Sequence, residues 1–385
     1  MNSRPSPAVA AFFAVALLAL GFTVGYGFHT AQSTAPAEKT SNAAQGQQSS
    51  TRLGRKSAPV PPVVKGLHIS PDGARVAFTA VYKNGLESSR FVLNLKNGRF
   101  ETRPAPRGWQ DFVVQWSNDG RRILFDREKI PRSVADTQAG LHEENLDEKS
   151  EPRPLTPIPT LPSGEKSVSG LWTSSGDLVV KTRREPKTLF VIRNGHAQLA
   201  DRAAVTYYQN RVVRENGHDV LYVVRDVPGQ QKQNALFRVE NGRARQISPG
   251  LGKIEWAYVA ENARWLIICR TQPDSSDWQW TLYRVSPQGT VLSSTRSVPS
   301  DVISVFWSPD FKRVLGASGD ALWAVDVPSL QSRQIGRQKG WNADDAGWLP
   351  GENAVLVAAH GTLWKIDVTS GVARAVWKFP ASYWN

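Results

Sequence analysis

Seven copies of one short pattern recur along the sequence and constrain the fold more than any other feature. Each copy has a large apolar residue, then a polar turn, then an apolar triplet about seven positions further on. A period near 40–45 residues is typical of four-stranded propeller blades. The sequence therefore predicts an all-β fold, a β-propeller of seven four-stranded blades, with six or eight blades left open by the long second copy. The first residues of the copies, called anchors below, are Ile69, Trp116, Trp172, Val213, Val259, Trp307 and Trp348.

Turn chemistry explains why each copy ends one strand and begins the next. Pro presets the backbone of a tight turn and Gly tolerates a positive φ, so Ser-Pro-Asp-Gly at residues 70–73 is suited to reversing the chain. Most copies continue with an alternating or apolar run, such as 91–95 or 235–239, then a Gly- or Asn-containing turn and a more polar run such as 244–248. The apolar triplet predicts the second strand of each blade, and these two runs predict the third strand and the outer strand.

The second copy departs from the others because residues 128–156 form a long charged stretch. Glu143 and Glu144 are among its acidic residues. Residues 141–146 are a candidate third strand. We expect a solvated loop between strands here, and the alternative is a binding loop on a rigid scaffold.

Three of the turns resemble the repeat of TolB-type propellers, which runs approximately Trp-Ser-Pro-Asp-Gly, then a basic residue, then a strand ending in Ala-Phe. Residues 69–78 read Ile-Ser-Pro-Asp-Gly-Ala-Arg-Val-Ala-Phe, residues 307–310 read Trp-Ser-Pro-Asp, and residues 116–120 are a close variant. The resemblance covers about residues 63–379 and implies a WD-repeat-like β-propeller. TolB itself joins a small α/β domain to six blades in the periplasm, whereas this chain has seven copies behind a tether. The resemblance therefore implies the fold and not the TolB role.

An uninterrupted apolar run occupies residues 8–28, and Arg4 precedes it. A membrane-spanning helix needs about 20 apolar residues, and a basic residue before the run places the N-terminus in the cytoplasm. Residues 1–28 are therefore predicted to be a signal anchor, that is, one N-terminal transmembrane helix. The alternative is a cleaved signal peptide, for which Ala35-Pro36-Ala37 offers a small-x-small site.

Residues 29–62 are rich in Ala, Ser, Thr, Gln and Pro and show no apolar periodicity. Such a segment cannot bury enough surface to offset its ordering entropy. It is predicted to be a disordered linker to a β-propeller at residues 63–385. The expected location is the extracytoplasmic face of the cytoplasmic membrane, or a secreted or periplasmic state after cleavage.

Composition narrows the expected partners. The formal net charge is +13, but the basic residues are scattered among acids and no nucleic-acid motif accompanies them, so specific nucleic-acid binding is not predicted. A protein or a cell-envelope polymer is the expected partner, in addition to the membrane contacted by the N-terminal helix. The single cysteine, Cys269, lies in an apolar run and is expected in the core.

No catalytic, cofactor-binding or metal-binding grouping is recognisable in the sequence. The six histidines contain no i, i+4 pair of the kind found on a zinc-binding helix. Asp344 is followed by a second carboxylate, Asp345, but adjacent residues of a strand point to opposite faces, so the two are not expected to converge. The residues that we single out for a binding role are His68 beside the channel rim, Trp278 and Trp280 on one strand face, and Trp341 and Asp344 before the last inner strand.

These observations predict a membrane-tethered propeller that acts as a binding or scaffold module for a protein or polymer partner. The alternative is a propeller enzyme, a hydrolase or lyase acting on a glycan or peptide, with residues from several blades gathered in the central channel.

Overall fold

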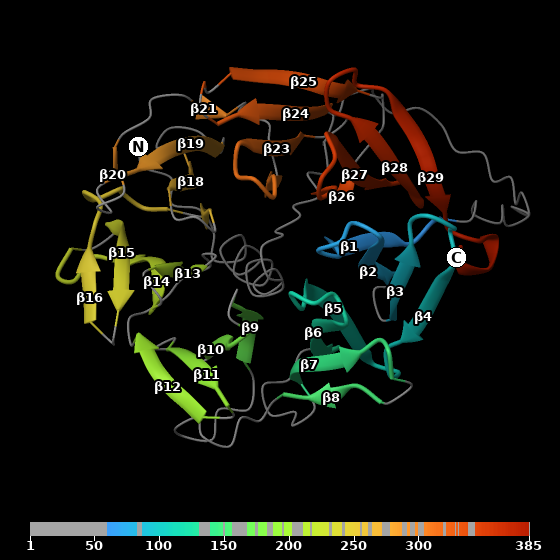
Figure 1. Cartoon of the computed structure of the whole chain (residues 1–385), viewed down its shortest axis with the longest axis horizontal. Coiled ribbons are helices and arrows are strands. Elements are labelled where there is room, and N and C mark those ends of the chain that lie inside the picture. Colours follow the sequence, from blue (N-terminus) through green and yellow to red (C-terminus); the bar gives the residue numbers. More distant parts are fainter. Residues whose placement is uncertain are drawn as a thin grey trace, which may run out of the picture.

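Seven antiparallel sheets stand around one central axis and form a seven-bladed β-propeller (Figure 1). Each blade is one uninterrupted stretch of chain and has four strands, with the outer strand of blade 5 in two pieces. The computed structural model describes residues 60–384 apart from 83–86, 131–138, 149–150, 156–167, 174–175, 183–187, 195, 202–210, 216–217, 231–232, 241–242, 255, 261–263, 272–277, 287–290, 293–296, 299–303, 319–320, 328, 330 and 338–342.

The strands of each blade run from the inside of the ring outward in chain order. Blades 1 to 3 comprise β1 (Val63–Ile69), β2 (Arg75–Val81), β3 (Ser88–Asn94), β4 (Phe100–Pro104); β5 (Trp109–Trp116), β6 (Arg122–Lys129), β7 (Gly140–Asn145), β8 (Arg153–Pro154); and β9 (Val168–Trp172), β10 (Leu178–Thr182), β11 (Leu189–Arg193), β12 (His196–Asp201).

The remaining blades follow the same order. Blades 4 to 7 comprise β13 (Arg211–Glu215), β14 (His218–Asp226), β15 (Asn234–Glu240), β16 (Arg243–Gln246); β17 (Trp256–Val259), β18 (Trp265–Thr271), β19 (Trp278–Val285), β20 (Val291–Leu292), β21 (Ser297–Val298); β22 (Ser304–Trp307), β23 (Arg313–Ser318), β24 (Ala321–Asp326), β25 (Gln331–Arg337); and β26 (Ala343–Trp348), β27 (Ala354–Ala359), β28 (Thr362–Asp367), β29 (Ala373–Lys378), followed by a short 3₁₀ helix η2 (Ala381–Tyr383).

The strand register confirms the predicted hairpins. In every blade the anchor residue pairs with the first residue of the apolar triplet, because the polar turn between them closes the first hairpin. The pairs are Ile69–Val76, Trp116–Ile123, Trp172–Leu178, Val213–Val220, Val259–Leu266, Trp307–Val314 and Trp348–Val355.

The best-formed of these turns share a Ser–Asp arrangement. In the turn at 70–75, the Ser70 hydroxyl donates to Asp72 Oδ1 (2.5 Å) and accepts from the Arg75 backbone N–H (2.9 Å). The Ala74 N–H also donates to the Asp72 carboxylate (3.0 Å). These donors lower the pKa of Asp72, the Ser70 hydroxyl most strongly. The same contacts recur in blades 2 and 6, at Ser117–Asp119 and Ser308–Asp310.

The core of the ring lies between the blades, in the interfaces that we call seams. The buried apolar residues fall into one cluster for each pair of neighbouring blades, including blades 7 and 1. Cys269 is fully buried in the cluster between blades 5 and 6, as predicted. Each sheet thus buries both faces, which explains the apolar triplet in its second strand.

An Arg–Trp contact joins neighbouring blades at several seams. The arginine that ends the first turn of one blade lies over the anchor tryptophan of the next: Arg75 over Trp116 (5.1 Å) and Arg122 over Trp172 (5.3 Å). Arg313 of blade 6 lies over Trp348 of blade 7 in the same way (4.7 Å). Cation–π contacts of this kind contribute about 0.5–1 kcal/mol at exposed sites.

At two of these seams the tryptophan also donates a hydrogen bond to the preceding blade. Trp116 Nε1 donates to the His68 carbonyl (2.7 Å), and Trp348 Nε1 donates to the Phe306 carbonyl (3.0 Å). At these seams the tryptophan anchor recognised in the sequence therefore ties its blade to the one before it.

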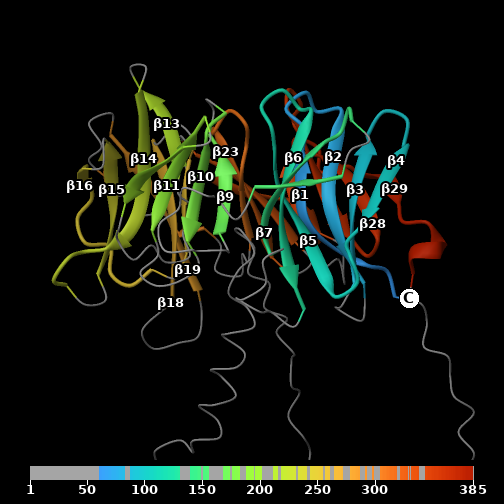
Figure 2. The same cartoon turned by 90° about the horizontal axis from the view of Figure 1, so that it is seen from below.

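The seam between blades 7 and 1 closes the ring without such a contact. Ile69 stands at the anchor position of blade 1, and Ala354 stands where blade 7 would need the arginine. No strand of blade 1 belongs to the sheet of blade 7, so side chains hold this seam together. Both the start of β1 and the end of β29 lie on the face opposite the first turns, on the lower side of Figure 2.

Blade 2 corrects one prediction. Residues 140–145 form its third strand, as one reading of the sequence allowed, but 128–156 is not simply a solvated loop. Glu128 and Glu144 are buried, at 4% and 3% exposure. Neighbouring strands enclose both side chains, which period-two patterns alone do not reveal.

The predicted membrane segment and residues 29–59 of the predicted linker lie outside the described residues, which begin at Val60. Among the residues that the structure describes, no helix is long and apolar enough to cross a bilayer.

Candidate functional site

The most unusual feature of the described part of the ring is a row of charged side chains inside the seam between blades 1 and 2. It is an alternating series: Arg127, Asp111, Arg90, Glu144, Arg103 and Glu101. The series runs from the inner strands to the outer strand of blade 1, from β5 and β6 through β3 and β7 to β4. We call it the charge row.

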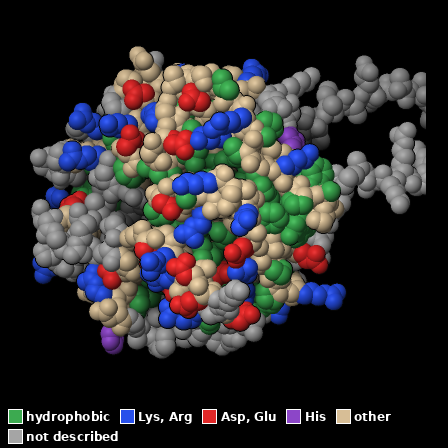
Figure 3. All heavy atoms as spheres, turned by 45° about the vertical axis from the view of Figure 1, so that its right-hand side comes forward, with side chains coloured by type: hydrophobic (Ala, Val, Ile, Leu, Met, Phe, Trp, Pro, Cys, Tyr) green, Lys and Arg blue, Asp and Glu red, His purple; other side chains and the backbone are tan. Residues whose placement is uncertain are grey.

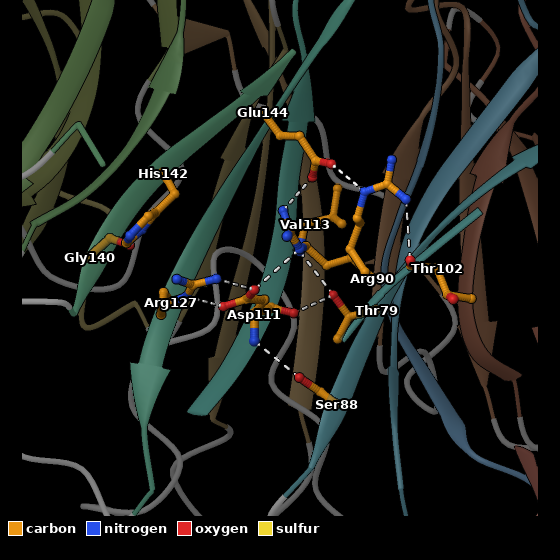
Figure 4. Close-up of polar contacts among 11 residues, drawn as sticks. Thr79, Ser88, Arg90, Thr102, Asp111, Val113, Arg127, Gly140, His142 and Glu144 are labelled. Carbon is orange, nitrogen blue, oxygen red and sulfur yellow. Dashed lines mark hydrogen bonds and ion pairs between the residues drawn. The ribbon is translucent and has the colours of Figure 1, made fainter. Parts of the chain in front are cut away.

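The distances within the charge row are short. Arg127 binds Asp111 with two parallel hydrogen bonds (2.7 and 2.8 Å), a geometry that planar guanidinium and carboxylate groups favour. Arg90 Nε lies 3.2 Å from Asp111 Oδ2, and Arg90 Nη1 donates to Glu144 Oε2 at 2.7 Å. Figure 4 shows Asp111 between the two arginines.

The outer half of the row continues to the surface. Arg103 Nε donates to Glu144 Oε1 (3.0 Å), and Arg103 Nη2 donates to Glu101 Oε2 (2.8 Å). The side chains of Arg90, Asp111 and Glu144 are 2%, 0% and 3% exposed, whereas Glu101 is 65% exposed. The row thus carries alternating charge from the buried seam to water.

Backbone contacts fix the inner end of the row. The Thr79 hydroxyl donates to the Asp111 carbonyl (2.7 Å) and accepts from the Val113 N–H (3.0 Å), and Ser88 Oγ accepts from the Asp111 N–H (3.1 Å). Gly66 approaches here with φ +59°, and a Cβ at that position would lie 2.3 Å from the Val113 carbonyl oxygen. Only glycine fits so close an approach.

An aromatic pair lines the row. The Arg90 guanidinium lies 3.6 Å from the centroid of the Phe125 ring, and the His142 ring stacks on Phe125 at 5.2 Å. His142 Nδ1 lies 2.9 Å from the Gly140 carbonyl oxygen, to which the neutral imidazole donates. Burial lowers the pKa of His142, and the positive charge of Arg127 adds to the effect. The imidazole is therefore neutral near pH 7.

The charge row holds its buried charges in ion pairs within the seam. Burial lowers the pKa of the Arg90 guanidinium, and the carboxylates of Asp111 and Glu144 oppose this effect. Both carboxylates accept hydrogen bonds from arginines. A general base must have an available lone pair within reach of a substrate proton, so we assign this row to positioning blade 2 against blade 1.

Residues outside the seam carry charges of both signs. Arg122 and Arg153 each donate to Glu143 (3.2 and 3.0 Å), and Arg121 lies 3.6 Å from Asp147. Figure 3 brings this side of the ring forward and shows basic and acidic side chains interleaved over it. Exposed pairs of this kind contribute about 0–1 kcal/mol each.

Three outer strands differ, because each of them carries two basic residues and no acidic residue. In β16, β25 and β29 every basic residue is exposed and no acidic residue occurs. β25 and β29 belong to the neighbouring blades 6 and 7 and line adjacent stretches of the rim (Figure 1). The basic residues of the three strands are Arg243, Arg245, Arg333, Arg337, Arg374 and Lys378.

The residues predicted to bind a partner fall on several blades. His68 lies half-buried in β1, and Asp344 lies at an irregular position of β26, where the register shifts between Ala343 and Asp345. Trp278 and Trp280 belong to β19, where they pair with Thr271 and Cys269.

Placement on separate strands does not test a binding role. Trp341 and the side chains of Trp278, Trp280 and Asp344 lie outside the described residues. For all five candidates, binding stays a prediction.

Sequence reasoning missed the residues that the structure brings together. Asp345 is buried at 2% exposure and accepts a hydrogen bond from the Leu67 N–H of blade 1 (3.0 Å). Arg90 has the same strand parity as Val92, which packs against the apolar cluster between blades 1 and 2, and this parity turns Arg90 toward that seam. That parity was the available signal, but partners on another blade are not visible in a linear sequence.

Within the described ranges, no group of three or more His, Cys, Asp or Glu side chains is placed to hold a metal ion.

Comparisons with known proteins rest on the fold. No family model matches the chain, and no curated protein sequence matches it. An oligogalacturonate lyase from Vibrio parahaemolyticus is similar in structure, with a TM-score of 0.55, 13% identity, and coverage of 84% of this chain and 92% of the lyase.

Two peptidases also match. A prolyl endopeptidase has a TM-score of 0.54 at 14% identity. The match covers 82% of this chain, but this chain spans only 50% of the length of the endopeptidase. The β-propeller domain of the trilobed protease from Pyrococcus furiosus, described as having an open velcro topology, has a TM-score of 0.52 at 13% identity, with coverage of 83% and 98%. These likenesses show the β-propeller fold, and the narrower TolB-type resemblance stays a prediction.

Proposed function

We propose that this protein is a membrane-tethered extracytoplasmic propeller that binds an anionic polymer of the cell envelope on its outer rim. The observation that carries the proposal is the set of exposed basic side chains on β16, β25 and β29, strands that hold no acid. Arginine donates paired hydrogen bonds to carboxylate and phosphate groups.

A polymer suits this rim better than a protein does. Protein interfaces usually have an apolar, aromatic centre. Among the described residues the exposed large apolar side chains are Val60, Val63 and Val372, and none lies within the three basic strands. An acidic protein partner is therefore the weaker hypothesis.

The test measures binding of the full-length protein, held in detergent, to immobilised polygalacturonate and to neutral dextran. Binding to polygalacturonate that weakens with added salt supports the proposal. The double variant Arg337→Gln/Arg374→Gln is expected to bind about tenfold more weakly. The control, Arg121→Gln/Arg153→Gln, removes the same charge from blade 2 and should bind within about twofold of the wild type. Equal losses in both variants, or equal binding to dextran, would contradict the proposal.

The same assay distinguishes a propeller enzyme from a binding module. Likeness to a lyase and to an endopeptidase motivates it, but at 13–14% identity this shows the fold alone. Shortening of polygalacturonate during incubation, measured by size-exclusion chromatography, would favour a propeller enzyme over a binding module.

The proposed location has its own test. Protease added to spheroplasts should release the propeller by cutting within residues 29–62, whereas inverted membrane vesicles should protect it. Release from inverted vesicles would place the propeller in the cytoplasm instead.

A further inference from the structure

We propose that the ring opens at the seam between blades 7 and 1, and that residues Phe379–Trp384 act as a clasp that holds this seam shut. The proposal is independent of what the rim binds. It rests on how the last residues of the described chain pack against the first blade.

The clasp continues blade 7 but packs on blade 1. It follows β29 and contains η2, so it lies outside the sheet of blade 7. The ring of Phe379 lies 5.2 Å from that of Phe91 and 5.9 Å from that of Phe78, both in blade 1. The ring of Tyr383 lies 5.2 Å from Phe91 and 6.3 Å from Phe100.

Blade 7 holds the clasp by separate contacts. The Phe379 N–H donates to the Gly361 carbonyl in the turn between β27 and β28 (2.9 Å). Lys378 of β29 lies over the Trp384 ring at 5.3 Å, and within the clasp Trp384 Nε1 donates to the Phe379 carbonyl (3.1 Å). The clasp is therefore fixed to blade 7 by a backbone hydrogen bond and a cation–π contact, and to blade 1 by aromatic packing.

Blades 7 and 1 can separate at their aromatic faces without breaking any pairing between strands. The sheets of blades 7 and 1 share no strand, and the chain does not connect blade 7 to blade 1. At every other seam the chain itself joins the two neighbouring blades. Opening at this seam therefore keeps all seven sheets intact, whereas opening elsewhere must also stretch a connection.

One amide reports directly on this opening. The Leu67 N–H lies at the irregular part of β1, where the register shifts between Lys65 and His68, and it donates across the seam to Asp345 Oδ2 (3.0 Å). Leu67 is 3% exposed, so its amide exchanges with solvent only when the two blades part.

The experiment is hydrogen–deuterium exchange by mass spectrometry on the full-length protein in detergent, resolved at the Leu67 amide. Trp384→Ala is the test variant. The matched control is Trp323→Ala, which removes another half-buried indole, from the cluster between blades 5 and 6. Trp384→Ala is expected to speed exchange at Leu67 by about tenfold or more while the paired amides of β27 and β28 keep their protection. Trp323→Ala is expected to leave Leu67 unchanged.

Two outcomes would contradict the proposal that residues Phe379–Trp384 hold the seam shut. Unchanged exchange at Leu67 in Trp384→Ala would show that the segment does not hold the seam. Equal acceleration at Leu67 in both variants, or acceleration in all blades, would show general loosening of the fold. Tyr383→Ala provides a second variant, and a far-ultraviolet circular dichroism spectrum identical to that of the wild type confirms that each variant is folded.

Discussion

Two seams of this ring solve the same packing problem with opposite chemistry. Among the described residues, the core of the seam between blades 7 and 1 holds eleven buried apolar residues, Phe78, Phe91 and Phe379 among them, whereas that of the seam between blades 1 and 2 holds four beside the charge row. Blade 1 presents one face to each. The comparison shows that a blade can be apolar on one face and ionic on the other without a change in strand geometry.

The chain connection accounts for where each chemistry lies. Apolar burial is non-directional and adds up with area, about 25 cal/mol for each Å² removed from water, so it suits the seam that no peptide bond supports. Ion pairs lose their value when misplaced, because unpaired buried charge is costly. They suit a seam where the chain already sets the approximate position of blade 2.

Removing the centre of the charge row should have the largest effect. Asp111→Ala leaves the buried Arg90 and the partly buried Arg127 without their shared carboxylate, which is expected to lower the free energy of unfolding by about 3–5 kcal/mol. Urea unfolding followed by tryptophan fluorescence measures this. The control Glu101→Gln alters the exposed end of the same row and should change stability by less than about 1 kcal/mol. A small loss in Asp111→Ala would show that the row is dispensable.

Removing a buried pair together should cost less than the sum of the single changes. Arg90→Met and Glu144→Met each leave a charge without one partner, but the double variant removes both charges and fills the seam with apolar atoms. We expect a coupling energy of about 2 kcal/mol in a double-mutant cycle. Strict additivity would show that the two side chains act independently.

The apolar seam should respond in proportion to the volume removed. Phe91→Leu is expected to lower the free energy of unfolding by about 1–2 kcal/mol, and Phe91→Ala by about 3–5 kcal/mol. Thermal unfolding of the two variants checks this gradation. If Phe91→Leu were as harmful as Phe91→Ala, ring stacking rather than burial would dominate the seam.

The hydrogen bonds of Trp116 and Trp348 should contribute less to the free energy of unfolding than the burial of Phe91. Trp116→Phe removes the donor to the His68 carbonyl and weakens the contact with Arg75, for an expected loss of about 1 kcal/mol. Trp348→Phe, at the seam between blades 6 and 7, is the matched variant and should lose a similar amount. Different losses would show that the repeated contact is not energetically equivalent around the ring.

The smallest expected effect on stability is its dependence on pH through His142. The pKa of His142 is lower in the folded state than in the unfolded state, so the unfolded chain binds an extra proton as pH falls below about 6.5. Stability should therefore decrease between pH 7.5 and pH 5.5, and His142→Phe should show a smaller decrease over that range. Chemical unfolding at both pH values measures the difference. An identical decrease in the variant would exclude His142 as its source.

The sequence was sufficient for the repeat and not for the seams. Each hairpin is a local event set by an anchor, a polar turn and an apolar triplet, so the spacing predicted which residues pair, as Trp116 with Ile123. The charge row requires five strands from two blades, and each of its residues is an ordinary surface type when taken alone. Glu144 was therefore assigned to a charged stretch expected to be solvated, although the structure buries it.

The candidate binding residues illustrate the same limit. Asp344 stands out in the sequence because two carboxylates are adjacent, and strand alternation predicts that the pair points to opposite faces. Which member faces the neighbouring blade depends on the irregular register of β26, and it is Asp345 that reaches Leu67. A one-residue shift in a strand exchanges its two faces, and sequence pattern does not reveal such shifts.

The contiguity of the blades has a consequence for how such a protein changes size. Because every sheet is encoded by one uninterrupted segment, duplication or deletion of one repeat in the gene adds or removes a whole blade without dividing any sheet. The interface between the first and last blades has to form again, and in this ring its core is mainly apolar. A ring closed in this way keeps its blade number open to evolutionary change.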